Sequence, residues 1–423
     1  TLRETGAPVD SIQKMTIALS HKREELEALK RQEMDGERVR EFQSQNRPVS
    51  YQAFAAWLPD STTFLWYHWG EDQVTLLTHN SKGLALHSLG SPDNLRARIE
   101  ALQIMLGNPN SPISKTHEQG ELLLTMLIPS STILNNKLII SPDGPITRLP
   151  FEVLKQSNGA YLIENHQISY ALSATTLIQA PEQQAVSSVL AVAPSRWKEL
   201  SLLPLQQSNN ELKAITAHWE NTEQLVAEAA TKSNLRERLS TKSYDIIHLC
   251  THAQAGNSLG KENWIALNDS EENYLLYLDE LYGLNLNTEL AVLSACQTGI
   301  GELAKGEGSM SLARGFTYAG CRSVIASMWK VEHEPNAWII GRFYDYLAQG
   351  VPKDQALRLA KLDFMNPSEQ DQWEIHPHHW AAMTAIGDMG AIQIQKSSGF
   401  QSYYALAILM ILIILILVWR AKS

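Results

Sequence analysis

Cys296 and His252 are the two residues whose types and positions could do chemistry. Cys296 ends the apolar run LAVLSAC, residues 290–296, and a polar turn that contains two glycines follows it. His252 ends a second apolar run, YDIIHLCTH, residues 244–252. A cysteine is a nucleophile as its thiolate, and a nearby imidazole supplies the base that removes the thiol proton. The two residues therefore predict nucleophilic catalysis, provided that the fold brings them together.

The elements that would do so are strands of one parallel sheet. The two residues lie 44 positions apart (296 − 252 = 44), which leaves room for a crossover connection with a helix. In open α/β sheets, catalytic groups collect beyond the carboxyl ends of the strands. Apolar runs alternate with helical patterns beyond residue 205, which predicts an α/β fold with a mostly parallel sheet covered on both faces. The expected strands are 244–252, 290–296 and 322–331, and the expected helices are 208–219, 277–283, 309–320, 335–349 and 353–365.

The preceding half of the chain is predicted to be smaller and rich in strands. Residues 62–89 contain two strand-like runs separated by turn signals. A helix over 92–106 and a polar loop rich in Asn, Pro and Ser follow. Further short apolar runs that predict strands are 137–144, 167–173 and 188–195.

Four long stretches resemble the successive motifs of one known family. They are KLIISPDGPITRLPFEVL (137–154), YDIIHLCTHA, VLSACQTGIGELAKGEGSMSLARGFTYAGCRSVIASMWKV and HPHHWAAMTAIGD. Together they resemble the CHAT domain, a caspase-like cysteine peptidase family related to separases and often found after tetratricopeptide repeats. The resemblance covers roughly residues 47–390 and implies a caspase-like sheet sandwiched by helices.

The resemblance also implies roles for individual residues. His252 takes the role of general base and Cys296 that of nucleophile, in a cysteine endopeptidase that acts on a protein partner through an acyl-enzyme. From their places at the two strand ends, the backbone amides of Ala253 and Cys296 are candidate oxyanion donors. By similarity to the caspase layout, three residues that leave the next strand would line the substrate groove: Ser327, Met328 and Trp329. The family usually has glycine after the catalytic histidine, so Ala253 leaves a catalytically inactive membrane scaffold as the alternative.

Two further groups of polar residues have competing explanations. Asp143, in SPDGP, could favour a basic residue of the substrate, but a Pro-Asp-Gly turn explains an aspartate there equally well. His376, His378 and His379 could bind zinc in a hydrolase of another class, although no carboxylate or cysteine nearby in the sequence completes four ligands. Packing is the favoured explanation for these histidines, and we expect neither a metal nor another cofactor.

Composition excludes several classes of protein. The 423 residues carry a formal net charge of −10, with 44% hydrophobic and 19% charged residues, which indicates a globular chain and disfavours nucleic acid as a partner. The three cysteines are irregularly spaced, so they do not predict a disulfide framework. We expect Cys250 and Cys321 to serve packing, and His248 to be a buried structural residue of the same strand as His252.

The two ends of the chain differ from the middle. Residues 1–45 read as a charged helical segment, the end of an upstream region that we expect to carry repeats or to bind a regulatory protein. Its apolar stripe falls at Ile12, Met15, Leu19, Leu26 and Leu29. Residues 46–395 then form the CHAT domain, divided into 46–185 and 186–390.

A single membrane-spanning helix is predicted at 403–419. This stretch is uncharged, is apolar on every face and has tyrosines at one end and Trp419 at the other, as at membrane interfaces. The alternative is a buried core helix. A basic tail, 420–423, ends the chain, and the side of the membrane that carries the CHAT domain stays open.

Overall fold

The computed structural model describes most of the middle of the chain. The described residues are 48–180, 185–195, 197, 205, 208–254, 263–268, 270, 274–294, 296–297, 309–330, 332–366 and 375–394. The charged segment 1–45 and the expected membrane span 403–419 lie outside them. Among the described residues, no helix is both long enough and apolar enough to cross a membrane.

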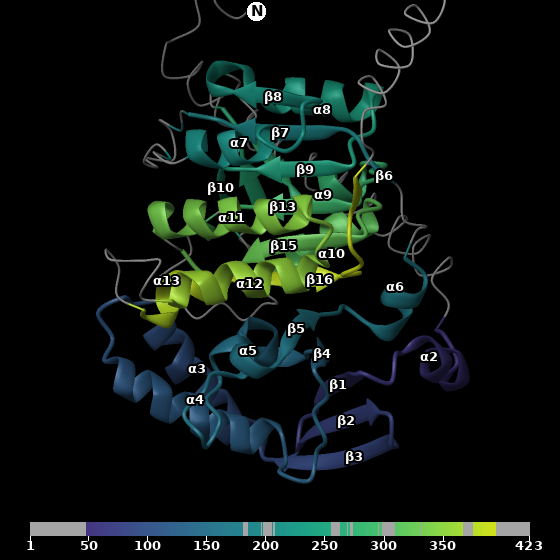
Figure 1. The fold of residues 1–423 in the computed structure, drawn as a ribbon, viewed down its shortest axis with the longest axis vertical. Helices are drawn as coiled ribbons and strands as arrows, with labels where there is room; N and C mark the ends of the chain where they lie inside the picture. The colour runs from purple at the N-terminus through teal and green to yellow at the C-terminus, as the bar shows by residue number, and fades with distance from the viewer. Residues whose placement is uncertain are drawn as a thin grey trace, which may run out of the picture.

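One eleven-stranded sheet runs through the part of the chain that the structure describes (Figure 1). In spatial order its strands are β3 (Gly83–Gly90), β2 (Val74–Asn80), β1 (Thr62–Trp69), β4 (Lys137–Ser141), β5 (Gln167–Tyr170), β16 (Met383–Gly387), β15 (Ser323–Ser327), β13 (Leu290–Leu293), β9 (Ile246–Leu249), β7 (Val189–Ala193) and β8 (Thr222–Val226). Most neighbours in it are parallel, which confirms the mixed α/β fold with a mostly parallel sheet.

The direction of the strands reverses between β15 and β16, and again between β1 and β2 and between β2 and β3. Strands β8, β7, β9, β13 and β15 run one way, and β16 is antiparallel to β15. Strands β5, β4 and β1 then follow the direction of β16. As a result, the carboxyl ends of β9, β13 and β15 lie at one end of the sheet's strands, and those of β1, β4 and β5 lie at the opposite end.

Two smaller sheets accompany the large one. The four-stranded sheet has the order β12 (Leu275–Tyr277), β11 (Trp264–Ala266), β10 (His252–Gln254) and β14 (Cys296–Gln297). It begins where β9 and β13 leave the large sheet. The other pairs β17 (Gln393–Ile394) with β6 (Ala185–Val186).

Helices cover both faces of the sheet, and α11 and α12 lie across the face toward the viewer in Figure 1. The helices are α2 (Tyr51–Trp57), α3 (Pro92–Leu106), α4 (Ile113–Leu127), α5 (Leu162–Asn165), α6 (Ala174–Ile178), α7 (Ser208–Thr216), α8 (Lys232–Thr241), α9 (Leu278–Tyr282), α10 (Ser309–Tyr318), α11 (His333–Ala348), α12 (Lys353–Met365) and α13 (Pro377–Trp380). Strands β7, β9, β13 and β15 are buried along their whole length, as their mainly apolar sequences predict for a sheet covered on both faces.

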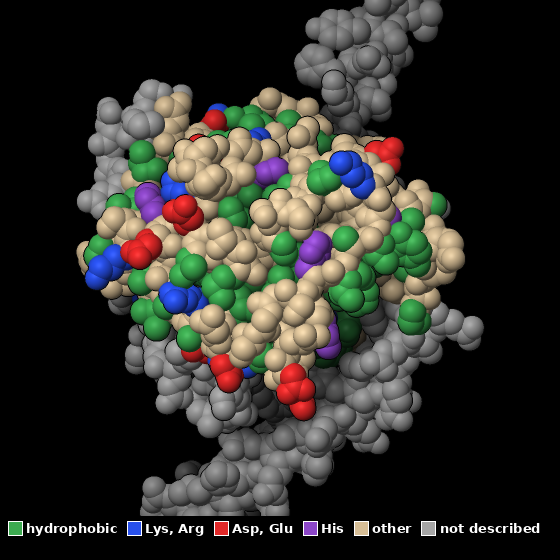
Figure 2. Space-filling view, turned by 90° about the horizontal axis from the view of Figure 1, so that it is seen from below, with side chains coloured by type: hydrophobic (Ala, Val, Ile, Leu, Met, Phe, Trp, Pro, Cys, Tyr) green, Lys and Arg blue, Asp and Glu red, His purple; other side chains and the backbone are tan. Residues whose placement is uncertain are grey.

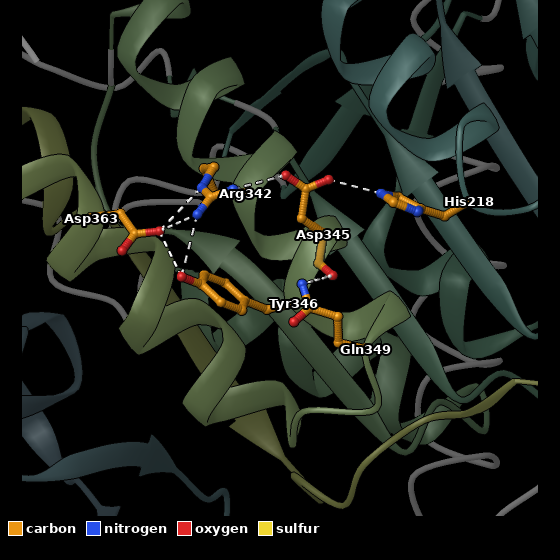
Figure 3. A network of polar contacts seen from close by, with 6 residues as sticks. All are labelled: His218, Arg342, Asp345, Tyr346, Gln349 and Asp363. Atoms are coloured by element: carbon orange, nitrogen blue, oxygen red, sulfur yellow. Dashed lines mark hydrogen bonds and ion pairs between the residues drawn. The ribbon is translucent and has the colours of Figure 1, made fainter. Parts of the chain in front are cut away.

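A polar network joins the helices of the visible face (Figure 3). Arg342 of α11 donates to Asp363 of α12 at 2.7 Å, and the Tyr346 hydroxyl donates to the same carboxylate oxygen at 2.7 Å. Asp345 of α11 in turn lies 2.8 Å from the imidazole of His218, which follows α7. The network therefore fixes three helices of one layer relative to each other.

Three expectations about the elements need correction. The run 244–252 is not one strand, because β9 ends at Leu249 and His252 opens β10 in another sheet; the run 290–296 is divided between β13 and β14 in the same way. The two strand-like runs of 62–89 are three strands, β1 to β3. The polar loop after 106 contains the 15-residue helix α4, whose buried face is formed by Thr116, Gly120, Leu123 and Leu127.

Candidate functional site

The backbone register brings His252 and Cys296 side by side. Leu249 at the end of β9 is level with Leu293 at the end of β13. Both chains then advance three residues and pair again as parallel strands, with His252 opposite Cys296 and Ala253 opposite Gln297. The two residues therefore lie next to each other beyond the carboxyl ends of two neighbouring strands, where α/β sheets place their reactive groups. For Cys296 and Gln297 the structure describes the backbone only.

His252 is buried and packs against an indole. Its side chain is 4% exposed, and its ring lies edge-on to the ring of Trp197, with 4.6 Å between centroids and 78° between planes. Trp197 follows β7, the neighbour of β9 on the side away from β13. The sequence reading missed Trp197, which stands in a segment without a periodic pattern.

Strand β9, which precedes His252 in the chain, carries a buried polar cluster. The His248 imidazole, which is fully buried, lies 3.0 Å from the Tyr344 hydroxyl through Nδ1 and 3.0 Å from a Glu211 carboxylate oxygen through Nε2. The potential ligand atoms of Glu211, His248 and Cys250 lie within 4.8 Å of one another. The ion pair joins α7 to β9, and the Tyr344 contact joins α11 to it, so His248 has the structural position expected for it.

Cys321 lies far down the chain from this cluster and is buried in the core. Burial raises the pKa of its thiol well above the usual range, while a hydrogen bond with Thr288 opposes part of that rise. The thiol therefore stays protonated near neutral pH, and its reactivity is low. This environment agrees with the packing role expected for Cys321.

The residues that leave β15 lie at the same end of the sheet as His252 and Cys296. Ser327 is buried, and its hydroxyl donates to the carbonyl oxygen of Trp329 at 2.7 Å. The Met328 amide donates to the Ala382 carbonyl at 2.9 Å, and the Trp329 indole nitrogen donates to the His378 carbonyl at 3.0 Å. The segment 327–329 is therefore held against α13 and the start of β16.

A second residue that the sequence reading missed supports the Cys296 segment. The amide of Asn336, in the first turns of α11, donates to the Ser294 hydroxyl at 2.8 Å, and both side chains are buried. Ser294 stands between β13 and β14, where the chain passes from one sheet to the other. The hydrogen bond therefore ties that passage to α11.

Asp143 is not brought together with His252. It follows β4, whose carboxyl end lies at the opposite end of the sheet's strands. Its carboxylate accepts hydrogen bonds from the Gly144 and Trp69 amides, both at 2.8 Å, and so shapes a turn in which Gly144 has a φ of +57°. It also lines a cavity of about 180 Å³, whose lining residues include His68, Ser141, Thr147, Leu172, Met310 and Arg314.

The three histidines before β16 have separate partners. The Nδ1 of His376 accepts from the His378 amide at 3.1 Å and caps α13. The Nδ1 of His378 lies 2.7 Å from the Leu106 carbonyl, to which it must donate. His378 and His379 form a possible metal-binding group with Glu332, within 4.8 Å, rather than with His376. The three histidines therefore do not make one ligand set.

Curated relatives match parts of the chain. Tetratricopeptide repeat protein 28 of Mus musculus is 30% identical over 113 residues, which are 27% of this chain and 4% of that protein. Tetratricopeptide repeat protein 28 of Homo sapiens is 24% identical over 302 residues, covering 60% of this chain and 12% of that protein. This chain therefore spans about an eighth or less of the length of these relatives.

Solved structures that align with this chain include a cysteine proteinase and a separase complex. The Arg-specific cysteine proteinase gingipain R aligns with a TM-score of 0.44 at 10% identity, over 71% of this chain and 75% of that chain. The separase–securin complex of Saccharomyces cerevisiae aligns with a TM-score of 0.47 at 10% identity, over 79% of this chain and 31% of that chain. Both TM-scores lie below 0.5, so neither likeness bears on the chemistry of this chain. The family model of the CHAT domain matches residues 117–388, which is more than half of the sequence, and the chain belongs to the CHAT-domain family.

Proposed function

We propose that this protein is a membrane-anchored cysteine endopeptidase that cleaves a protein partner with Cys296 as nucleophile and His252 as general base. The observation that carries the proposal is the backbone register of β10 and β14, in which the two residues are direct neighbours. The proposed class of enzyme, a cysteine endopeptidase, comes from the resemblance of the sequence to the CHAT domain. The neighbouring position supplies the proximity that a thiol and its base require.

In the reaction, His252 takes the proton of the Cys296 thiol, and the thiolate attacks the scissile carbonyl. The carbonyl oxygen becomes an oxyanion, for which the backbone amides of Ala253 and Cys296 are the proposed donors. The imidazolium returns its proton to the leaving amine as the C–N bond breaks, which leaves a thioester. Water then gives a proton to His252 and attacks the thioester, releasing the carboxylic acid and the free thiol. The proposed groove beside this bond is the segment 327–329, at the same end of the sheet.

Cleavage of a diverse peptide library by the full-length chain in mild detergent tests the proposal. We expect cut products from the wild type and none from Cys296→Ala or His252→Ala. Cys321→Ala is the matched control, because it removes a buried thiol elsewhere and should leave the cut sites unchanged. Cleavage that survives Cys296→Ala would contradict the proposal.

The alternative function is a CHAT-fold membrane scaffold without activity, which Ala253 in place of the family's usual glycine favours. A thiol-directed covalent probe separates the two functions. Labelling of Cys296 that is lost in His252→Ala supports the enzyme, since labelling requires the thiolate. Equal, slow labelling of both proteins, together with silence in the library assay, supports the scaffold.

We further propose that residues 403–419 anchor the protein in a membrane. The support is the sequence alone: 17 uncharged residues reach about 25 Å as a helix, the short end of what spans a bilayer. Membrane fractions washed with alkaline carbonate should retain the full chain and release a version that ends at residue 396. Release of both would contradict the anchor. The side on which the CHAT domain lies then follows from protease accessibility in sealed vesicles.

A further inference from the structure

The outer face of the first three strands exposes an unusual number of large apolar side chains. Trp66 on β1 pairs with Leu77 on β2, which pairs with Leu86 on β3, so the three form one row across the sheet. Trp66 is 53% exposed and Leu86 is 70% exposed. In the adjacent row, Leu84 of β3 is 50% exposed. These four residues, Trp66, Leu77, Leu84 and Leu86, are called the open face below.

The other face of β1 and β2 is covered, and that of β3 is covered only in part. Leu65, Tyr67, Val74 and Leu76 are completely buried, in one core cluster with the apolar residues of α3 and α4. Strand alternation therefore separates a covered face from an uncovered one. Figure 2 views the molecule from this end and shows hydrophobic side chains gathered in groups at the surface. Exposed apolar groups of this kind mark interaction sites.

Helix α2 covers only the beginning of this outer face. Phe54 of α2 packs edge-on against Phe64 of β1, with 5.0 Å between ring centroids. Tyr51, the first residue of α2, lies edge-on to His79 of β2 at 5.6 Å, and its hydroxyl lies 3.3 Å from the His79 ring. Phe64 and His79 belong to the row of Leu84, next to the row of Trp66. The chain therefore enters the described structure at the border of the open face.

The segment just upstream has a matching apolar stripe. In residues 9–45 the apolar positions Ile12, Met15, Leu19, Leu26 and Leu29 recur at helical spacing. As a helix, Leu19 to Leu29 would cover about 15 Å, and three strands are about 10 Å wide between the outer two. From residue 45 to Tyr51, six residues reach at most about 20 Å, so the downstream end of the segment lies within that distance of this border.

We infer that the open face is the docking surface of residues 9–45 of the same chain, with their apolar stripe on Trp66, Leu77, Leu84 and Leu86. Helix α2 covers the outer face at the row of Phe64 and His79, and the proposed contact would cover the next row of the same face. It ties the upstream region to the strands farthest along the sheet from His252. This proposal does not depend on the proposed peptidase activity.

Photo-crosslinking of the full-length chain in mild detergent tests the contact directly. Leu86→p-benzoylphenylalanine should crosslink to residues 9–45 of the same molecule. Ile104→p-benzoylphenylalanine is the matched control, since Ile104 is 62% exposed on α3, away from the open face, and should give no such crosslink. A mixture of isotopically light and heavy chains distinguishes crosslinks within one molecule from those between two. Crosslinks only between molecules, only to detergent, or none at all would overturn the proposal.

Hydrogen exchange gives a second readout that does not depend on the probe. Amides of residues 9–45 should lose their protection in Leu86→Lys and keep it in Ile104→Lys. Amides of β9 and β13 report whether either variant has unfolded, and they should be unchanged in both. Equal protection of residues 9–45 in the two variants, with those strands intact, would also overturn the proposal.

Discussion

Trp197 holds its ring edge-on to that of His252, with the two centroids 4.6 Å apart and both side chains buried. The contact joins the segment after β7 to the first residue of β10. Aromatic pairs in this geometry contribute beyond the area that they bury, and they restrict the rotation of both rings. Trp197 is therefore placed to restrict the orientation of the His252 imidazole.

Replacing Trp197 tests this positioning role. If the proposed dyad acts, Trp197→Ala should lower kcat/KM by about tenfold, less than the ~10²–10⁴-fold effect of a lost general base. The loss should fall on kcat more than on KM, because the indole orients a catalytic group and is not proposed to contact the substrate. Peptide hydrolysis under steady-state conditions measures both constants.

Trp219 supplies the matched control for that prediction. It is also buried and lies edge-on to Tyr344, at 5.6 Å between centroids, away from His252. Trp219→Ala should lower stability about as much as Trp197→Ala and leave kcat of the folded fraction unchanged. Equal kcat values for the two variants would show that Trp197 serves packing alone.

Removing one member of the His248–Glu211 pair should destabilise the fold strongly. His248→Leu leaves the Glu211 carboxylate buried without its partner, which costs about 3–5 kcal/mol in unfolding free energy. The double variant His248→Leu/Glu211→Leu should recover a large part of that loss, because no buried charge remains. Urea unfolding followed by circular dichroism measures the three proteins.

An exposed ion pair of similar length provides the comparison. His218 and Asp345 lie 2.8 Å apart, against 3.0 Å for His248 and Glu211, but both are partly exposed (Figure 3). His218→Ala should cost less than about 1 kcal/mol. A loss as large as that of His248→Leu would mean that burial does not decide the difference between the two pairs.

The strands of the fold could be predicted where a continuous run of apolar residues indicates a buried strand. Strands β7 and β13 are apolar at every position because both of their faces are covered. The breaks after Leu249 and Leu293 could not be predicted, because the residues that follow are compatible with a continuing strand while the chain changes its partner strand. Which strand a segment pairs with depends on the tertiary structure, and the local sequence does not determine it.

The location of the candidate site could be predicted in part, because it depends on strands that are parallel neighbours. Strand ends at His252, Cys296 and Ser327 share one end of the sheet because β9, β13 and β15 are parallel neighbours, as the crossover spacing predicts. Asp143 could not be placed in this way. Its strand β4 follows the direction of β16, and the reversal between β15 and β16 has no signature in the sequence.

Gly320 should tolerate no side chain. Its φ is +105°, and a Cβ there would lie 1.8 Å from the Leu286 carbonyl oxygen. Gly83 has a similar φ of +102° but open space around it. Gly83→Ala should therefore cost about 1–3 kcal/mol from backbone strain alone, and Gly320→Ala should cost clearly more or prevent folding. Thermal unfolding of the two variants measures the difference, and equal melting temperatures would contradict the steric argument.

Acid should weaken the fold partly through His166. Burial lowers the pKa of this imidazole most, the charge of Arg358 lowers it further, and the hydrogen bond with the Asn135 carbonyl opposes both. The folded state therefore favours the neutral ring, whereas the unfolded chain binds a proton below a pH of about 6.5. The contribution of His166 is complete above that pH and is lost as the pH falls through it. The urea midpoint should drop between pH 7 and pH 5, and the drop should be smaller in His166→Gln, which keeps a donor for Asn135. An identical drop in the two proteins would show that His166 does not titrate across this range.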